Sequence, residues 1–487
     1  MSEWRKALIA SMANSNQEVY DVVTKKGTTY KEIFASALEF GSSLKIEKQS
    51  TVSVVLPNSE DYLIAYLACV MYGFIFAPVP HFLTKNEIEK AIEYHNSSIL
   101  ITDREDLALT VPAVKVTKSK FAGTLNESEW KLPKLKENDI LCLYYSSGTT
   151  GDPKGVLYSH GNKFSLISSI SHGFNFNAST KHLAFLPFGH TASLNYSVFP
   201  ALLVGGPLFI ASSFEKIRSR FFSILNEYEI QYVQIVPTVA QTLIKLRENI
   251  SDIDLSNLEY IGCGSAPLSI SVQENFQKQF GIPLANLYGL SETGPSHIDD
   301  PTSKDWKPGG IGIPLNVNEC IIAPDGEILL RGENVMKGYF KNEEQTRKVL
   351  VDGWFHTGDY GFEKDGKFFF LDRKKDLVII GGINVYPAEV EDILYGSNLV
   401  SECVVFGVPD KTQGEKIIAS VVLKDQSTEH QRDFESELIS HCRKHLSTFK
   451  IPSTILFSDA IPKTASGKLI RREVREGYLL SLTSSTD

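Results

Sequence analysis

The chain has 487 residues and a mass of 54.2 kDa, which is more than a single hydrophobic core usually serves. We therefore expect one large and one smaller domain, and a small scaffold held together by disulfides is excluded. Apolar residues make up 42% of the chain and charged residues 22%, which is typical of a globular protein. The net charge of −9 indicates no nucleic-acid partner and no basic membrane-binding surface, so any nucleotide must be held by a local site.

The cysteines and the N-terminal segment predict a cytoplasmic protein. The cysteines are widely spaced and include no close pair of the kind that binds zinc or exchanges disulfides. Residues 1–21 contain Glu3 and Glu18 but no sustained apolar run, so they are not typical of a secretory signal. We expect reduced, structural thiols at Cys69, Cys142, Cys263, Cys320, Cys403 and Cys442.

An uncharged stretch at residues 62–84 is long enough in principle to cross a membrane. It contains Gly73, Pro78 and Pro80, which would interrupt a membrane-spanning helix. We therefore predict no transmembrane segment and interpret residues 62–73 as a buried helix that is followed by a strand.

Apolar runs typical of strands alternate with helical patterns through the first part of the chain. Such alternation predicts a doubly wound α/β sheet, because each helix carries the chain back to begin the next parallel strand. We expect strands at 51–57, 74–79, 98–103, 140–145, 182–187, 207–212, 232–237 and 258–263, and helices at 62–73, 85–94, 219–229 and 238–249.

From about residue 319 the pattern changes to short strands broken by Asp-Gly turns, as at 323–332 and 363–372. This pattern is typical of a β-rich subdomain. A second compact α/β unit then runs to the C-terminus. The predicted fold class is therefore α/β, with a large N-terminal domain of doubly wound sheets plus a β-rich subdomain, and a small C-terminal α/β domain.

A segment rich in glycine and hydroxyl residues, YYSSGTTGDPKG, occupies residues 144–155. Glycines let backbone N–H groups approach phosphate oxygens, and the hydroxyls add donors. The segment is not the common phosphate loop of NTPases, because Lys154 is followed by Gly155, and the other Gly-Lys pair, which ends in Lys468, is followed by Leu469. Taken alone, such a segment is more often a surface turn.

Five further segments change that interpretation, because together with residues 144–155 they follow the motif order of one family. They are GCGSAPL at 262–268, NLYGLSETG at 286–294, GWFHTGD at 353–359, DRKKDLVIIGGINVYPAEVE at 372–391 and PKTASGK at 462–468. From about residue 62 to residue 472, the chain resembles the adenylate-forming superfamily of acyl-CoA synthetases, carrier-loading adenylation domains and beetle luciferases.

The resemblance implies an acid–thiol ligase that joins a carboxylate to ATP, releases pyrophosphate and passes the acyl group to a thiol. ATP, Mg²⁺ and coenzyme A are then the expected cofactors and substrates. Because both half-reactions develop negative charge, we expect catalysis by positioning and electrostatics. The resemblance also implies an AMP-binding N-terminal domain at 1–371, a hinge at 372–376 and a mobile C-terminal domain at 377–487.

The resemblance assigns most of the matching residues to ATP. Glu292 is the expected Mg²⁺ ligand, a role suited to a hard carboxylate oxygen, and Ser291 is expected to hold the α-phosphate. Tyr288, which taken alone would be a core residue, would face adenine, and Asp359 and Arg373 would bind the ribose. The other expected nucleotide-binding residues are Ser146, Ser147, Gly148, Thr149, Thr150, Gly151 and Lys154 at the β- and γ-phosphates, and Gly264, Ser265 and Ala266 beneath the base, together with Asn286.

Two lysines match the C-terminal motifs of the family. Lys468, which taken alone would be an exposed surface lysine, is expected to reach the bond that forms between the acid and the α-phosphate. Lys375 falls at the hinge about which the C-terminal domain rotates between the half-reactions. After rotation, the segment with Gly381 and Gly382 would line a tunnel for the pantetheine arm, since glycine suits a wall close to a thin ligand.

The segment LPFGHTAS at residues 186–193 resembles the part of the family that lines the acyl pocket. His190, which taken alone would be a packing or surface residue, stands at the family's aromatic or histidine position. Thr191 stands where relatives that activate amino acids carry Asp, so a buried ammonium would be unpaired and an uncharged aliphatic or aryl acid is favoured. Leu287 stands where many relatives have Gly, and its bulk favours medium-chain or aromatic acids over very long chains.

We therefore expect an ATP-dependent carboxylic acid–CoA ligase, an acyl-CoA synthetase of the kind found in fatty acid metabolism. The alternatives are a stand-alone adenylation enzyme that loads the pantetheine of a carrier protein, a luciferase-like adenylate oxidase, and an AMP-binding regulator without chemistry. Lys468, Glu292 and Asp359 argue against the regulator. The terminal sequence TSSTD lacks the peroxisomal address that is typical of the luciferase branch.

Overall fold

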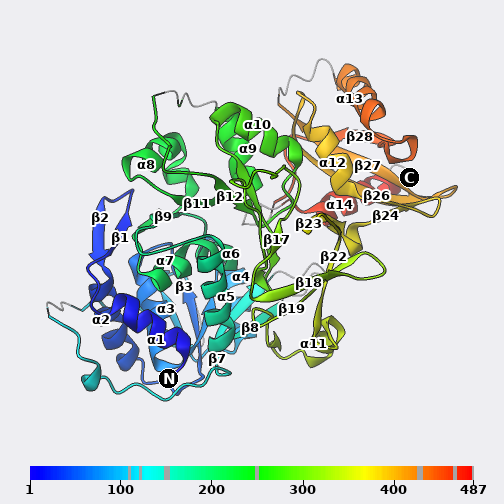
Figure 1. Ribbon diagram of the computed structural model, residues 1–487. Coiled ribbons are helices and arrows are strands. Elements are labelled where there is room, and N and C mark those ends of the chain that lie inside the picture. Colours follow the sequence, from blue (N-terminus) through cyan, green and yellow to red (C-terminus); the bar gives the residue numbers. More distant parts are fainter. Residues whose placement is uncertain are drawn as a thin grey trace.

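The computed structural model shows two seven-stranded sheets, a β-rich layer and a separate C-terminal sheet, with helices packed against them (Figure 1). The predicted α/β class, with a large N-terminal part and a small C-terminal part, is confirmed. The structure describes residues 1–107, 111–119, 123–146, 154–246, 250, 252–424, 431–463 and 469–484.

The first sheet has the strand order β20-β8-β7-β4-β3-β5-β6. Strands β3 to β7 run parallel, and β8 and β20 are added antiparallel at one edge. Its strands are β3 (Thr51–Val55), β4 (Ile75–Pro78), β5 (Ile99–Thr102), β6 (Ala113–Val114), β7 (Ile140–Ser146), β8 (Lys154–Ser159) and β20 (Gly338–Tyr339). The helices of this region are α1 (Glu3–Met12), α2 (Tyr30–Ser43), α3 (Glu60–Tyr72), α4 (Lys85–His95) and α5 (His160–Gly173).

The uncharged stretch at residues 62–84 forms the buried helix α3 and the strand β4, as predicted. Helix α3 begins after Ser59, whose hydroxyl accepts a hydrogen bond from the N–H of Tyr62, and it ends at Gly73 in the left-handed conformation. Its 13 residues span about 20 Å, less than the roughly 30 Å of a bilayer core. No helix in the described part of the chain is long and apolar enough to cross a membrane.

The second sheet has the strand order β13-β12-β11-β9-β10-β1-β2 and is parallel except for the β1–β2 hairpin. Strands β9, β10 and β11 are shorter than the apolar runs that predict them, because those runs continue into the loops at the carboxyl ends of the strands, whereas β12 begins three residues later than predicted. They are β1 (Glu18–Asp21), β2 (Lys26–Thr29), β9 (His182–Ala184), β10 (Leu208–Ile210), β11 (Tyr232–Ile235), β12 (Ile261–Gly264) and β13 (Leu284–Leu287). The helices beside it are α6 (Thr191–Ser193), the π-helix η2 (Leu194–Val198), α7 (Phe199–Val204), α8 (Phe221–Glu227), α9 (Pro237–Leu246) and α10 (Ile270–Phe280).

The predicted β-rich subdomain is confirmed as an antiparallel layer joined to the two sheets by short strand pairs. Both predicted Asp-Gly turns are hairpins, one between β18 and β19 and one between β22 and β23. The elements are β14 (Gly289–Leu290), β15 (Gly294–Pro295), β16 (His297–Ile298), β17 (Ile313–Pro314), β18 (Asn318–Ile322), β19 (Glu327–Gly332), α11 (Glu343–Val349), β21 (Leu350–Val351), β22 (Trp354–Lys364) and β23 (Lys367–Arg373).

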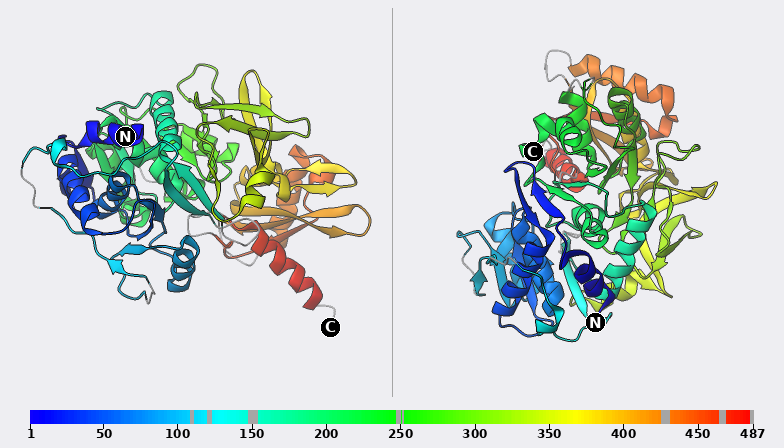
Figure 2. Two further views of the ribbon diagram at one scale, coloured as in Figure 1. Left: turned by 90° about the horizontal axis from the view of Figure 1, so that it is seen from below. Right: turned by 60° about the vertical axis from the view of Figure 1, so that its left-hand side comes forward.

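The C-terminal part has its own sheet and its own hydrophobic cores, and lies to one side of the rest of the chain (Figure 2). Helix α12 packs against both this sheet and α10 of the N-terminal part, where the amide and hydroxyl of Ser271 bond to Asp392. The elements are β24 (Val378–Ile380), β25 (Ile383–Val385), α12 (Pro387–Tyr395), β26 (Val400–Asp410), β27 (Gly414–Leu423), α13 (Gln431–His445), β28 (Thr454–Phe457) and α14 (Arg471–Ser484).

Candidate active site

Three of the predicted nucleotide-binding residues meet where the second sheet adjoins the β-rich layer. Tyr288 directly follows β13, and Asp359 and Arg373 face each other as paired residues of β22 and β23. The hydroxyl of Tyr288 donates a hydrogen bond of 2.9 Å to Oδ2 of Asp359. The Nε atom of Arg373 lies 3.2 Å from Oδ1 of the same carboxylate. Side chains that are far apart in the sequence therefore form one connected polar group.

Burial and charge set the ionisation of this polar group. Burial, reinforced by the Asp359 carboxylate, raises the pKa of Tyr288 well above its usual value, so the phenol stays protonated. Burial, the largest single influence, lowers the pKa of the Arg373 guanidinium, but Asp359 and the other acidic groups nearby together outweigh it and raise that pKa above its usual value. An anion held between a phenol and a guanidinium suits the recognition of sugar hydroxyls, although this role stays a prediction.

Ser291 and Glu292 lie on the turn between β14 and β15, close to the edge of the first sheet. The hydroxyl of Tyr158 donates a hydrogen bond of 2.8 Å to the carbonyl of Ser291. The hydroxyl of Tyr339 donates one of 2.8 Å to Oε1 of Glu292. The Nζ atom of Lys154 lies 5.1 Å from the centre of the Tyr339 ring. The expected metal ligand and the lysine of the phosphate segment therefore contact the same tyrosine.

The two ends of the phosphate segment are brought together by the pairing of β7 with β8. Ser146, the last residue of β7, is the partner of Lys154, the first residue of β8. Residues 147–153 of the predicted segment lie outside the described residues, and so does Lys468; their expected roles stay predictions. These undescribed positions of the segment include Ser147, Gly148, Thr149, Thr150 and Gly151.

The segment predicted to pass beneath the base forms a tight turn at the carboxyl end of β12. Ser265, followed by Ala266, has a φ of 70°, a left-handed conformation that non-glycine residues rarely adopt. Gly264 has no room for a side chain, because a Cβ atom there would lie 2.4 Å from the carbonyl oxygen of Leu287. The turn and the neighbouring strand are thus in close backbone contact, which fits the expected approach of the main chain to a flat ligand.

Asn286 forms hydrogen bonds within the protein, and its expected role in nucleotide binding stays a prediction. Its side-chain amide donates a hydrogen bond of 3.0 Å to the carbonyl of Gly310, and its backbone N–H donates one of 2.9 Å to Asp299. Asp299 also accepts a hydrogen bond of 2.8 Å from the indole of Trp306. Burial raises the pKa of Asp299 to about 7. These bonds fix the position of Asn286 near the end of β13, two residues before Tyr288.

The predicted hinge at 372–376 comprises the last two residues of β23 and a 3₁₀ turn at Lys374–Asp376. A pocket of about 340 Å³ adjoins this turn, a volume within the range of small-molecule sites. Arg373 lines this pocket and also contacts Asp359, so the predicted hinge lies next to the polar group formed by Tyr288, Asp359 and Arg373. The pocket is lined by Thr357, Gly358, Arg373, Lys374 and Lys375.

Gly381 and Gly382 form the turn between β24 and β25, with φ values of 57° and 83°. A Cβ atom at either position would meet no atom of the described chain within 4 Å. This turn therefore faces solvent in the present arrangement. Its role in a pantetheine tunnel, which the resemblance places after a rotation, stays a prediction.

The residues predicted for the acyl pocket lie beside the second sheet. His190 directly precedes α6, which begins at Thr191, and burial lowers the pKa of His190 to about 4, so its ring is neutral. Leu287 is 4% exposed and covers Gly262 of the neighbouring strand, where an added Cβ atom would lie 2.7 Å from Cδ1 of Leu287. The side chain of Leu287 therefore occupies the space above Gly262. Its expected effect, a smaller acyl pocket, stays a prediction.

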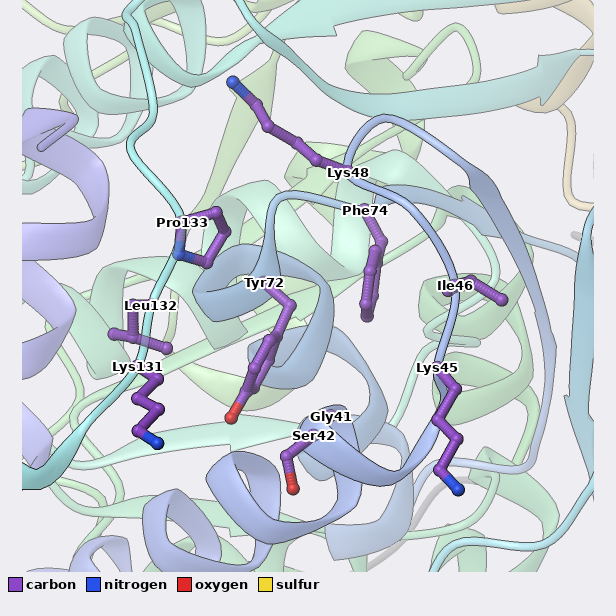
Figure 3. A pocket seen from close by; sticks show the side chains of 10 residues that line it. All are labelled: Gly41, Ser42, Lys45, Ile46, Lys48, Tyr72, Phe74, Lys131, Leu132 and Pro133. Carbon is purple, nitrogen blue, oxygen red and sulfur yellow. The ribbon is translucent and has the colours of Figure 1, made fainter.

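A further pocket of about 530 Å³ lies away from all of these residues, between the ends of α2 and α3 and the segment before β7 (Figure 3). The rings of Tyr72 and Phe74 stack in its wall, and lysine side chains stand at its rim. It contains none of the residues that the motifs single out. It is lined by Gly41, Ser42, Lys45, Ile46, Lys48, Tyr72, Phe74, Lys131, Leu132 and Pro133.

Sequence reasoning missed Tyr158, Tyr339 and Lys163, which lie next to the phosphate segment. The Nζ atom of Lys163 is buried, bonds to Oδ1 of Asn195 at 2.8 Å and lies 4.6 Å from the ring centres of Tyr144 and Tyr158. Burial lowers the pKa of Lys163 to about 8. No motif marks these residues, because the pairing of β8 with β20 brings Tyr158 and Tyr339 together and the packing of α5 adds Lys163.

Comparison with known proteins agrees with this geometry. The AMP-binding enzyme family matches residues 10–340, and the AMP-binding enzyme C-terminal domain matches residues 389–468. A feruloyl-CoA synthase from Amycolatopsis is 33% identical over 92% of this chain and 94% of the relative. A long-chain-fatty-acid–CoA ligase from Bacillus subtilis is 32% identical over 93% of this chain and 90% of the relative.

The fold also matches that of solved enzymes. The crystal structure of ATP-bound MatB from Rhodopseudomonas palustris superposes with a TM-score of 0.87, covering 98% of this chain and 99% of the other at 24% identity. The relatives that match along nearly the whole chain are CoA ligases for chemically different acids. The chain belongs to the AMP-binding enzyme family and is an adenylate-forming acid–thiol ligase, an acyl- or aryl-CoA ligase that forms AMP and pyrophosphate.

Proposed function

We propose that this ligase activates an uncharged medium-chain aliphatic or aryl acid as its acyl-adenylate and transfers it to coenzyme A. The observation that carries the proposal is the buried carboxylate of Asp359, held between Tyr288 and Arg373, the second of which also lines a pocket. In the first half-reaction, a carboxylate oxygen of the acid attacks the α-phosphorus of ATP and pyrophosphate leaves. In the second, the thiol of coenzyme A attacks the acyl carbon and AMP leaves.

The residues of the site would act by holding charges in place. Asp359 and Arg373 would fix the ribose, and the hydroxyl of Ser291 would donate to the α-phosphate on which charge develops. Lys154 would offset the charge of the departing pyrophosphate. Lys468, from its place in the family motif, would offset the repulsion between the acid and the α-phosphate.

Glu292 would hold Mg²⁺. Its carboxylate is a hard oxygen donor, and Tyr339 bonds to only one of its two oxygens in the described contacts. A single protein carboxylate suits this ion, which keeps most of its waters and takes further oxygens from phosphates. When bound, the ion would neutralise phosphate charge.

Coenzyme A is preferred over a carrier-protein thiol because the relatives matched along nearly the whole chain bear the names of CoA ligases.

Thr191 leaves no carboxylate for the ammonium of an amino acid. Leu287 shortens the space above Gly262, which supports a medium-chain or aromatic acid.

The test is pyrophosphate release across a panel of carboxylic acids, with product masses measured with and without coenzyme A. We expect AMP, pyrophosphate and an acyl-CoA to form only when ATP, Mg²⁺, acid and coenzyme A are all present. Formation of ADP and an acyl phosphate would refute the proposal.

A further inference from the structure

A buried glutamine on the second sheet has no hydrogen-bond partner among the residues that the structure describes. Gln234, on β11, is 2% exposed, and neither its Oε1 nor its Nε2 atom bonds to any described residue. The hydroxyl of Tyr232, two residues earlier on the same strand, is also buried without a partner. A buried polar group without a hydrogen bond destabilises the fold, so a purely structural role would favour an apolar side chain at either position.

The comparison with Gln273 shows how this protein treats a structural glutamine. Gln273 is equally buried, at 1% exposure. Its Nε2 atom donates to the carbonyl of Leu284 at 2.9 Å, and its Oε1 atom accepts from the N–H of Gly309 at 2.9 Å. Both polar atoms of the Gln273 amide therefore form hydrogen bonds, whereas neither polar atom of the Gln234 amide does so with any described residue.

Gln234 and Tyr232 project from the same face of the sheet as Leu287, one of the residues predicted for the acyl pocket. Successive residues of a strand alternate between faces, so these two share one face, while Val233 and Ile235 pack in the core on the other. Gln234 is the partner of Gly262 on β12, and a Cβ atom at Gly262 would lie 3.1 Å from the Tyr232 hydroxyl and 2.7 Å from Leu287. The unpaired amide therefore lies next to the space that Leu287 partly fills.

The strand register indicates how far Gln234 lies from the expected nucleotide site. The turn expected beneath the base begins at Gly264, two residues beyond Gly262 on β12, and two strand residues span about 7 Å. Ligands of open parallel sheets bind at the carboxyl ends of the strands, which here include the ends of β11, β12 and β13. An acid whose carboxylate meets ATP at this edge would therefore place a group about one aromatic ring away from the carboxylate near Gln234.

We propose that Gln234, assisted by Tyr232, is a specificity-determining residue that hydrogen-bonds a polar substituent on the acid, so that the substrate is a ring-hydroxylated aromatic acid. This inference rests on the proposed function. The amide donates through Nε2 and accepts through Oε1, so it pairs with a hydroxyl in either sense. A site with an unmet hydrogen-bonding group rejects an analogue that lacks the matching group.

The test compares 4-hydroxybenzoic acid with benzoic acid in the pyrophosphate-release assay, in the full-length enzyme and in Gln234→Leu. The wild-type enzyme should show a kcat/KM that is roughly 10- to 100-fold higher for the hydroxylated acid. Gln234→Leu should reduce this ratio to about one, chiefly by accepting benzoic acid better and the hydroxylated acid worse. Gln273→Leu is the matched control and should leave the ratio of wild type unchanged.

Thermal unfolding without any substrate supplies a second readout. Gln234→Leu should have a melting temperature equal to or above that of wild type, because it removes unpaired polar atoms, whereas Gln273→Leu should lower it. A wild-type enzyme with no preference for the hydroxylated acid, an unchanged ratio in Gln234→Leu, or a melting temperature lowered as much as in Gln273→Leu would overturn the inference and leave the proposed function standing. Absence of pyrophosphate release with every acid would overturn both.

Discussion

Arg471, the first residue of α14, forms an ion pair of 2.9 Å with Asp376 in the predicted hinge. The same guanidinium lies 2.8 Å from Glu391 of α12 and 3.7 Å from Asp372 at the end of β23. Asp372 in turn accepts a hydrogen bond of 2.7 Å from the N–H of Ala388. One arginine therefore connects the hinge to two helices of the C-terminal part.

Replacing Arg471 by Ala should destabilise the fold by roughly 3 kcal/mol, because three carboxylates around a largely buried site lose their common partner. Denaturant unfolding followed by circular dichroism measures this effect. Arg472→Ala is the matched control, since Arg472 is exposed and, among the described residues, pairs only with Glu476 of its own helix. Equal stabilities of the two variants would show that the Arg471 contacts contribute nothing.

The two half-reactions should be separable by mutation. Lys468→Ala should abolish adenylate formation from acid and ATP, where charge repulsion must be offset, and still convert a supplied acyl-adenylate to acyl-CoA. Lys375→Pro should leave adenylation nearly intact and slow thioester formation, because proline fixes φ at the hinge. Pyrophosphate release and acyl-CoA formation are measured separately for each variant. If both folded variants lost both half-reactions equally, rotation of the C-terminal domain would be the wrong mechanism.

Glu292→Gln should lower the rate of adenylation by at least 100-fold while leaving the melting temperature nearly unchanged. The amide still accepts the hydrogen bond from Tyr339, but it lacks the charge that a magnesium ion requires. Tyr339→Phe is the control, because it removes the hydrogen bond and keeps the charge, and it should lose no more than about tenfold. Magnesium titrations of both variants should show a raised requirement only in Glu292→Gln. Wild-type turnover in Glu292→Gln would remove this residue from the site.

Free α-amino acids should not be substrates. Thr191 offers no charge to an ammonium, and burying that group unpaired costs several kcal/mol. Exchange of labelled pyrophosphate into ATP, measured with each of the common amino acids, should stay at background. Efficient exchange driven by any of them would contradict the assignment of Thr191 to the acyl pocket.

Stability should fall as the pH decreases from 6.5 to about 4. The buried histidines stay neutral in the folded state but bind protons in the unfolded chain. Lowering the pH through this window therefore favours the unfolded state and decreases the free energy of unfolding. Burial raises the pKa of Asp299 to about 7 and that of Asp372 to about 6, and these two groups act in the opposite direction because the folded state binds their protons first. Burial lowers the pKa of His190 to about 4 and the pKa of His95, His160, His182 and His297 to about 3.

Near pH 5 the unfolded chain binds about five more protons on these histidines, and the folded state binds about two more on the two carboxyls. The unfolded chain therefore binds about three more protons in total, so the free energy of unfolding should change by roughly 4 kcal/mol per pH unit. Chemical denaturation at constant ionic strength, repeated at half-unit steps of pH, measures the slope. A free energy of unfolding that stays level or rises between pH 6.5 and pH 5 would show that these histidines are not buried as neutral rings.

The sequence by itself determined the family, the fold class and the local elements of the site. Helix α3 could be predicted because its cap, its apolar run and Gly73 lie within one short segment, and short-range interactions fix such elements. The motifs around Glu292 and Asp359 were likewise readable, since each is a continuous run of residues. Their expected contacts with ATP, and the roles of residues 147–151 and Lys468, stay predictions.

The tertiary structure alone decided which of these segments touch. The bond between Tyr339 and Glu292, and the ion pair between Arg471 and Asp376, join residues that no local pattern connects. The unpaired amide of Gln234 is visible only when every neighbour of β11 is in place. The physical reason is that contacts between distant segments depend on strand register and core packing, which the whole chain sets together.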